Sequence, residues 1–462
     1  MFQEITSLTQ TPGVPKEGQA CPASHRPAGF LVFWHRVRAQ WAVLLFPAMV
    51  VAQTADLSPD VLLLSKAMRH IREGILAVPN YTCLETIARD RLSPHSPTYE
   101  RLDLVRLEVV KQGRRELFAW PGARKFDDRP VTDFTGGGLM GNGTFALFAD
   151  DLFVNRAASM KVRGAEKLNG RALVRIDYSV RPIQGGTLTL TTAWGSAELN
   201  YSGSWWVDPA TLNLVRLDIA AEDIPAQLHL SSARIGIEYG EVSDATLPQT
   251  AVIEFAKDSG EVSRDAIEFT RCRKFSGDAQ LVFAETEPAP DAGHASSVAT
   301  LLPGGLSIPL RIETAIDPAS AGIGDEILAT VEKDVRDKQR LWLPRGSVVR
   351  GRIRRLAYRD QGSGYELVGL EFTEAEVAGD RFDFVVRLET AEPAAGMRTT
   401  FGARELTQTA GKPGIEESQV TEFFEREMPG VGYLYLTAAP YRVPGGLHMI
   451  WKTETVRQGS GG

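Results

Sequence analysis

Residues 199–219 read LNYSGSWWVDPATLNLVRLDI, and their pattern indicates the architecture of the chain. Apolar and polar residues alternate over 199–207 and again over 214–219, which is the period of two of half-buried antiparallel strands. Asp208 and Pro209 separate the two segments, and proline at the second position of a turn presets the backbone angle that the turn needs. The stretch therefore predicts a β-hairpin with one apolar face.

The same alternation continues on both sides of this hairpin. Segments with apolar residues at every second position lie at 81–87, 102–110, 174–180, 187–191, 235–239, 250–255 and 266–272. Before them, Ser58 and Pro59 form a typical helix start. Apolar residues then recur at close to 3.6-residue intervals up to residue 76. These patterns predict an amphipathic helix over 58–77 that precedes an antiparallel sheet, with a second helix at 144–153.

A linker divides the rest of the chain. Residues 285–300 read ETEPAPDAGHASSVAT and have no apolar period, which is typical of linkers. Alternating segments resume at residue 306 and continue to about residue 452. We therefore predict a mainly β (α+β) protein with these parts: a leader at 1–52, a first domain at 53–284, a linker at 285–300, a smaller β domain at 301–457 and a tail at 458–462.

The leader has the features of a secretory signal peptide. Arg36 and Arg38 precede an apolar run from Trp41 to Val51, and Ala52 follows. A basic segment, an apolar run of about ten residues and small residues at the cleavage point are typical of such signals. The run is shorter than the roughly 20 residues of a membrane span. We expect cleavage after Ala52, export to the periplasm or the outer-membrane periphery, and no membrane span in the mature chain. A buried amphipathic helix is the alternative.

Two cysteines would remain after cleavage. The sequence has three, and Cys21 lies in the predicted leader. Cys83 and Cys272 would then share an exported chain, where disulfides persist. An even number of cysteines in such a chain favours a Cys83–Cys272 disulfide. Two free buried thiols are the alternative.

Charge and motifs argue against several classes of protein. The chain of 462 residues has 51 Lys and Arg against 58 Asp and Glu, a net charge of −7, which is unlike a nucleic-acid-binding protein. HExxH, CxxC and GxSxG patterns are absent from the sequence, so we predict no metal site, no cofactor and no enzymatic activity. A Ser/His/Asp triad from distant positions stays open.

The segment Gly136–Gly143 lacks the Lys-Ser/Thr of a phosphate loop, and we predict a flexible loop there.

Two motifs resemble the periplasmic lipoprotein-carrier superfamily. They are residues 78–89, VPNYTCLETIAR, directly after the predicted helix, and residues 204–216, SWWVDPATLNLVR. The resemblance covers about residues 56–284. It implies a strongly curved, unclosed antiparallel half-barrel with helices over its concave side. It also implies a protein that holds an apolar ligand such as a lipid, an acylated peptide or a lipoprotein.

The second β segment is similar to the outer-membrane channel component of conjugation and type IV secretion machines. The residues that carry this similarity are 312–316, 324–335 and 343–351. The similarity implies a small β-barrel. We predict a compact antiparallel β-barrel or sandwich that docks the chain onto an envelope protein partner.

The hairpin supplies the candidate ligand-binding residues. By the parity of their positions, seven residues would line the concave side of a curled sheet: Leu199, Tyr201, Trp205, Val207, Val215, Leu217 and Ile219. An apolar concavity with few polar groups suits an acyl chain or an apolar peptide. The alternative is that the helix at 58–77 fills the concavity as ordinary core.

Together these features predict a non-catalytic, exported cell-envelope protein that binds an apolar ligand. Two alternatives stay open. One is a structural or assembly component of an outer-membrane or secretion complex. The other is a hydrolase of envelope polysaccharide or esters.

Overall fold

The structure is a computed structural model. It describes residues 58–77, 81–274 and 300–455, apart from gaps at 78–80, 113–114, 124, 127–130, 132–133, 135–142, 156–157, 182–187, 193, 243–244, 339, 358–365, 395–396, 401–427 and 437–440. The predicted signal peptide with its cleavage point and nearly all of the predicted linker lie outside the described residues. So do residues 136–142 of the glycine-rich segment.

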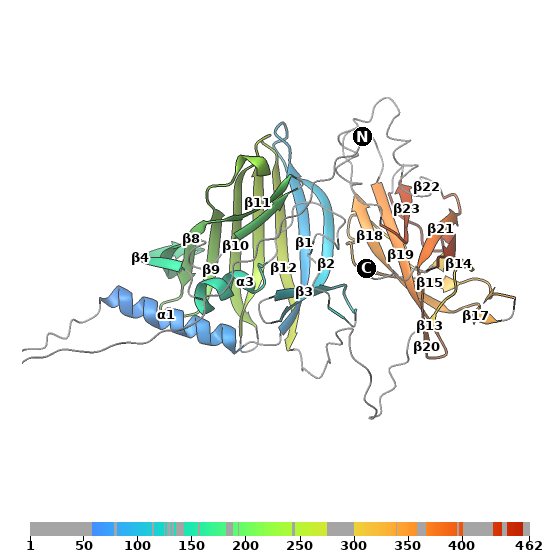
Figure 1. The fold of residues 1–462 in the computed structure, drawn as a ribbon, viewed down its shortest axis with the longest axis horizontal. Helices are drawn as coiled ribbons and strands as arrows, with labels where there is room; N and C mark the ends of the chain where they lie inside the picture. The colour runs from blue at the N-terminus through green and yellow to red at the C-terminus, as the bar shows by residue number, and fades with distance from the viewer. Residues whose placement is uncertain are drawn as a thin grey trace, which may run out of the picture. The chain divides into compact units, whose positions relative to one another are not determined.

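The first sheet contains ten antiparallel strands and curls strongly (Figure 1). In spatial order the strands are β3 (Arg115–Ala119), β2 (Glu100–Gln112), β1 (Tyr81–Leu92), β12 (Val262–Lys274), β11 (Ala245–Lys257), β10 (Leu230–Val242), β9 (Leu214–Ala221), β8 (Tyr201–Val207), β5 (Arg171–Val180) and β4 (Ala158–Leu168). β3 and β4 are the two edges, so the sheet is open. The predicted fold class, mainly β with a curved antiparallel half-barrel, is confirmed.

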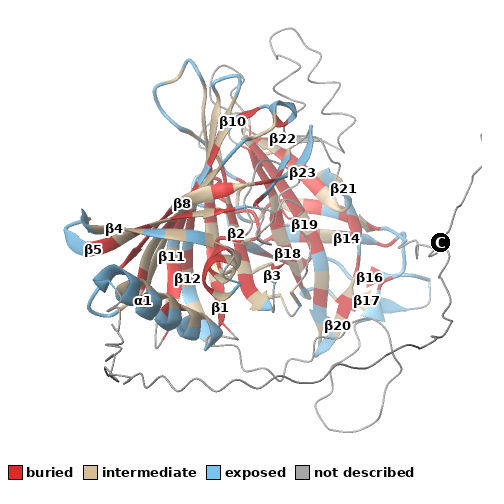
Figure 2. Ribbon diagram, turned by 60° about the vertical axis from the view of Figure 1, so that its left-hand side comes forward, coloured by how far each residue is buried: buried red, intermediate tan, exposed pale blue. Residues whose placement is uncertain are grey.

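Alternating burial explains why these segments pair as strands. On β5, Val174, Ile176 and Tyr178 are buried while Arg175 and Asp177 between them are partly exposed. Figure 2 shows the same alternation of buried and more exposed residues along neighbouring strands. A side-chain period of two places one apolar set on one face of a sheet. The sheet therefore has an apolar inner face and a polar outer face.

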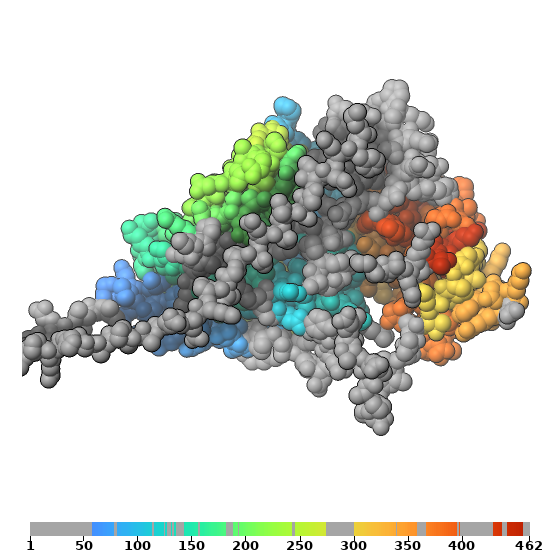
Figure 3. Space-filling model, viewed as in Figure 1, coloured from blue at the N-terminus to red at the C-terminus, as the bar shows by residue number. Residues whose placement is uncertain are grey.

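The first helix, α1 (Pro59–Leu76), begins as predicted. The Ser58 side chain accepts a hydrogen bond from the Val61 N–H at 3.4 Å, which satisfies one free donor of the first turn. Only Ala67 and Ile71 of this helix are fully buried. The outer side of α1 is exposed (Figure 3). Four more apolar residues are partly buried against the core: Leu63, Leu64, Met68 and Ile75. One face of the helix therefore packs on the core, and the opposite face is exposed.

The second sheet also has ten strands. Eight follow in the order β13 (Thr300–Leu301), β20 (Asp380–Asp383), β19 (Glu366–Val377), β18 (Val348–Ala357), β15 (Glu326–Val331), β14 (Ser307–Ile312), β24 (His448–Thr453) and β21 (Val386–Ala391). β23 (Val431–Leu436) pairs with β19 and with β22 (Met397–Thr400). The pairs are antiparallel except β13–β20. Trp451 and Phe372 pack edge to face in its core, with ring centroids 5.2 Å apart.

Two small hairpins lie outside the large sheets: β6 (Leu188–Thr192) with β7 (Gly195–Leu199), and β16 (Val335–Arg336) with β17 (Leu341–Leu343). A short 3-10 helix, η3 (Ala226–Leu228), precedes β10. The two large sheets share no strand. They meet where Ile323 forms a parallel bridge to Val105 of β2, and the Ile323 N–H donates to the Leu104 carbonyl at 2.7 Å. The division into two domains at a linker stays a prediction.

Candidate functional site

The inner face of the first sheet is the candidate ligand-binding face. Six of the seven predicted residues are buried there, with exposed fractions of 4% or less: Leu199, Tyr201, Trp205, Val207, Leu217 and Ile219. Leu199 belongs to the end of β7, directly before β8. The structure therefore places these six side chains in one apolar interior, whereas a role in ligand binding stays a prediction.

Val215 is the exception, because β9 contains a β-bulge. Trp206 pairs with Arg216, but Val207 pairs with Leu214, so that Val215 is an extra residue without a partner. Val215 is partly exposed, and Leu214 is buried in its place. An inserted residue reverses the parity of every position on one side of it. The assignment of Val215 to the buried face was therefore wrong, and Leu214 is the lining residue.

A short irregular segment covers this face. It contains α3 (Leu147–Ala149) and a π-helix, η1 (Asp150–Val154), and we call residues 143–154 the cover segment. Phe153 packs edge to face on Trp205, with centroids 5.2 Å apart, and Phe145 lies 5.5 Å from Phe269 of β12. The predicted helix at 144–153 is thus this α-turn and π-helix. Within the described residues it is the cover segment that packs on Trp205, while α1 packs against η1, β4 and β11.

A buried carboxyl group fastens the cover segment to the sheet edge. Glu116 of β3 accepts hydrogen bonds from the backbone N–H groups of Gly143 at 2.7 Å, Ala146 at 2.8 Å and Leu147 at 3.3 Å. Burial raises the pKa of Glu116 above its usual value, although these three donors oppose the rise. The ion pair of Lys111 with Asp150, at 2.5 Å, adds a second attachment. Polar contacts from two side chains, Glu116 and Lys111, therefore attach the segment, which contains no strand.

A second carboxyl lies beneath the same segment. Glu85 of β1 is 3% exposed, and its Oε2 atom has no hydrogen-bond partner among the described residues. Burial, with smaller contributions from Glu116 and Asp265, raises its pKa from 4.5 to about 8. Glu85 is therefore protonated and uncharged at neutral pH. The sequence contains a sign of this burial, because Glu85 falls on the same alternate positions of β1 as the buried Tyr81, Cys83 and Ile87.

Several other buried polar atoms of the first sheet lack a partner in the described part of the chain. They include the hydroxyl groups of Tyr81, Tyr201 and Tyr239 and the indole N–H groups of Trp205 and Trp206. An unpaired buried polar group costs about 1–3 kcal/mol, so most proteins avoid it. The interior is therefore mainly apolar, yet it contains several hydrogen-bond donors that have no partner.

The predicted disulfide is confirmed. Cys83 of β1 and Cys272 of β12 are bonded, across a sequence separation of 189 residues. It joins the first strand of the first sheet in the chain to the last.

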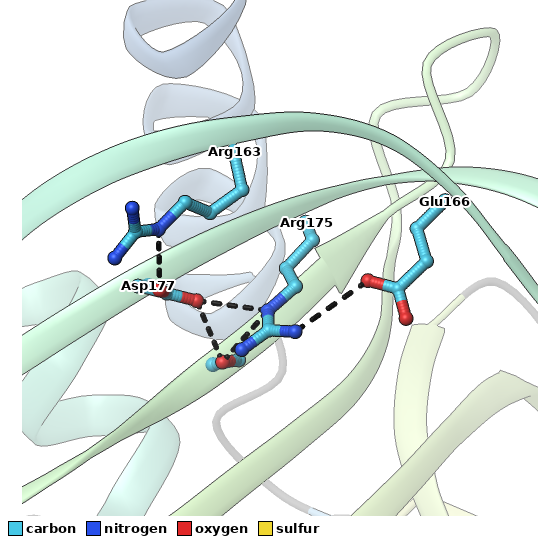
Figure 4. A network of polar contacts seen from close by, with 5 residues as sticks. Arg163, Glu166, Arg175 and Asp177 are labelled. Carbon is cyan, nitrogen blue, oxygen red and sulfur yellow. Dashed lines mark hydrogen bonds and ion pairs between the residues drawn. The ribbon is translucent and has the colours of Figure 1, made fainter.

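The outer face of the same sheet is polar (Figure 4). Asp177 accepts from Arg163 at 2.5 Å, from Arg175 at 2.9 Å and from the Ser204 hydroxyl at 2.8 Å. Partial burial opposes ionisation of Asp177, but these three donors outweigh it and lower its pKa. Glu166 lies 3.7 Å from Arg175. The network is satisfied within itself, which is expected of a solvated sheet face.

Neither a metal site nor a membrane helix is found where the structure can be described. No group of three or more His, Cys, Asp and Glu side chains could hold a metal ion in these residues. Among the same residues, no helix has the length and apolarity of a membrane span.

Comparison with known proteins gives remote likenesses only. No family model and no curated protein matches the chain. A LolA superfamily protein from Nitrosomonas europaea is 9% identical over 46% of this chain and 93% of its own, with a TM-score of 0.25. A DUF1329 family protein from Desulfovibrio piger is 12% identical over 47% and 94%, with a TM-score of 0.27.

A domain from Vibrio parahaemolyticus, described as outer membrane lipoprotein-sorting, is 11% identical over 47% of this chain and 92% of its own, with a TM-score of 0.27. At such identities and scores these likenesses assign no function to this chain. The similarity of the C-terminal part to a secretion-channel component stays a prediction.

Proposed function

We propose that the chain binds an apolar ligand on the inner face of the first sheet. The observation that carries the proposal is that a buried, apolar, curved face is covered in part by a short segment attached through Glu116 and Lys111. Displacing that segment would expose Trp205 and its neighbours without breaking any strand pair. An open sheet with such a face suits a lipid, an acylated peptide or the acyl chains of a lipoprotein.

The spare donors on this face fit a ligand that is not a plain hydrocarbon. Tyr201 and Trp205 each carry a buried N–H or O–H group without a partner. A carbonyl oxygen on an otherwise apolar ligand would accept a hydrogen bond from such a group and remove the cost of leaving it unpaired. The ligand class proposed is therefore an acyl chain with an ester or amide group.

We also propose that the protein acts in the cell envelope and without catalysis. The Cys83–Cys272 disulfide supports this compartment, because disulfides persist in oxidising compartments and are rare in the cytosol. Docking to an envelope partner through the second sheet is part of the same proposal and rests on sequence similarity alone.

Trp205 and Trp206 offer a matched pair of variants that tests the binding face. Trp205 is buried on the inner face, whereas Trp206 lies between the guanidinium groups of Arg175 and Arg216, 5.7 and 6.0 Å from its ring. With cis-parinaric acid as the fluorescent probe, we expect saturable binding that Trp205→Leu weakens at least about tenfold, since a ring contact is lost. Trp206→Leu should bind as the unchanged protein does.

Circular dichroism would confirm that both variants are folded. Absence of saturable binding to the unchanged protein, or equal losses in the two variants, would rule out the inner face as the binding site. Stable co-purification with an outer-membrane complex and no bound lipid would instead favour the assembly role.

A further inference from the structure

A separate cavity borders the first sheet, and we propose that it binds a small anionic group, a phosphate or a carboxylate. The cavity has a volume of about 430 Å³ and is lined by parts of β1, β2 and β12, the turn after β3 and the start of β15. None of the inner-face residues around Trp205 borders it. The proposal therefore does not depend on the apolar ligand proposed above.

A β-bulge beside the disulfide brings two arginines to this cavity. Thr82 pairs with Arg273 and Leu84 pairs with Thr270, so Arg271 and Cys272 both lie opposite the single residue Cys83. Bulges of this kind re-aim side chains and are common beside functional sites. Arg271 has a φ of 49°, a left-handed conformation that is unfavourable for a residue with a side chain. Arg271 and Arg273 both line the cavity.

One of the three arginines that line the cavity has no acidic partner among the described residues. Each carboxylate in the lining already has a cationic partner: Asp325 pairs with Arg106, Glu108 with Arg273 and Glu326 with Arg350. Arg271, by contrast, makes no ion pair or hydrogen bond with any residue that the structure describes. A guanidinium group is a strong donor to carboxylate and phosphate oxygens. The lining carries three arginines and three carboxylates. Arg271 is the one without an ion-pair partner in the described structure, because Glu326 pairs with Arg350 outside the lining.

Thr82 supplies a second, independent observation. Thr82 is one of the residues that line the cavity and is 2% exposed, yet its hydroxyl group has no hydrogen-bond partner in the described structure. Leaving a buried hydroxyl unpaired is unfavourable. An anionic oxygen in the cavity would accept from this hydroxyl and from Arg271 together. Such an oxygen belongs to a phosphate or carboxylate, either on a small soluble molecule or on a lipid headgroup.

Inorganic phosphate is the probe that tests the site on the full chain. We expect isothermal titration at constant ionic strength to show saturable binding of phosphate. Arg271→Gln should weaken it at least about tenfold, as the loss of a charge-assisted hydrogen bond does. Arg234→Gln removes an exposed arginine of β10 that does not border the cavity, and it should bind phosphate unchanged.

Thr82→Val separates a binding role from a structural one. Valine has nearly the same shape but no hydroxyl, so the variant should bind phosphate more weakly while its melting temperature without phosphate does not fall. No saturable binding of phosphate, an equal affinity in Arg271→Gln and Arg234→Gln, or full affinity in Thr82→Val would each overturn the proposal.

Vesicles then identify the source of the anion. Retention on phosphatidylglycerol vesicles but not on phosphatidylcholine vesicles, abolished in Arg271→Gln, would support a lipid headgroup. Phosphate binding without such retention would support a soluble ligand.

Discussion

At the scale of single residues, Glu85 links protonation to stability. The folded protein retains the Glu85 proton up to a pH of about 8, whereas an exposed glutamate releases it near 4.5. Between these two values the unfolded chain binds fewer protons than the folded one. The free energy of unfolding must therefore fall as the pH rises through this window. Asp265, whose pKa burial raises to about 7, adds a slope of the same sign.

Replacing Glu85 by glutamine should remove one part of this dependence. Glutamine is nearly isosteric and does not ionise, so the decline in unfolding free energy between pH 5 and pH 8 should be smaller in Glu85→Gln, by on the order of a few kcal/mol. Urea unfolding followed by tryptophan fluorescence at pH 5, 6, 7 and 8 measures the two slopes. Parallel slopes in the two proteins would show that Glu85 is ionised throughout.

At the scale of elements, the strands could be predicted from the sequence, whereas the cover segment could be predicted only in part. Alternation predicted the hairpin at 199–219 because one face of each strand is buried, which fixes a period of two. The bulge at Val215 could not be predicted from the sequence, because it depends on how β9 pairs with β8. The attachment of the cover segment to Glu116 was missed because its partners lie 27 to 31 residues away and no local pattern marks a buried carboxyl as a backbone acceptor.

The cover segment should open more readily than the strands beneath it. Glu116→Gln leaves one acceptor oxygen where the carboxylate has two, so that at least one backbone N–H of the segment loses its partner. Hydrogen exchange followed by mass spectrometry should show amides of residues 143–154 exchanging about tenfold faster in this variant, with β11 unchanged.

Glu198→Gln, which changes an exposed glutamate of β7, is the control and should leave the exchange of residues 143–154 as it is. Equal exchange in all three proteins would show that Glu116 does not hold the segment.

At the scale of the whole molecule, the disulfide fixes the sheet at its point of greatest sequence separation. β1 and β12 are neighbours in space, although they are the first and last strands of the first sheet along the chain. Their pairing closes a long loop of the chain, which has an entropic cost. A covalent bond there restricts the unfolded chain over 189 residues. Its effect on stability should therefore be near the upper end of what a single disulfide supplies.

The Cys83→Ala/Cys272→Ala double variant should lower the free energy of unfolding by about 2–5 kcal/mol, since the unfolded state regains the entropy of the open loop. Urea unfolding of the oxidised protein, the double variant and the unchanged protein in reducing agent measures this difference. The reduced protein and the double variant should agree, because both lack the bond, and reducing agent should leave the double variant unaffected. An oxidised protein no more stable than the double variant would mean that the bond adds nothing to stability and that strand pairing alone closes the sheet.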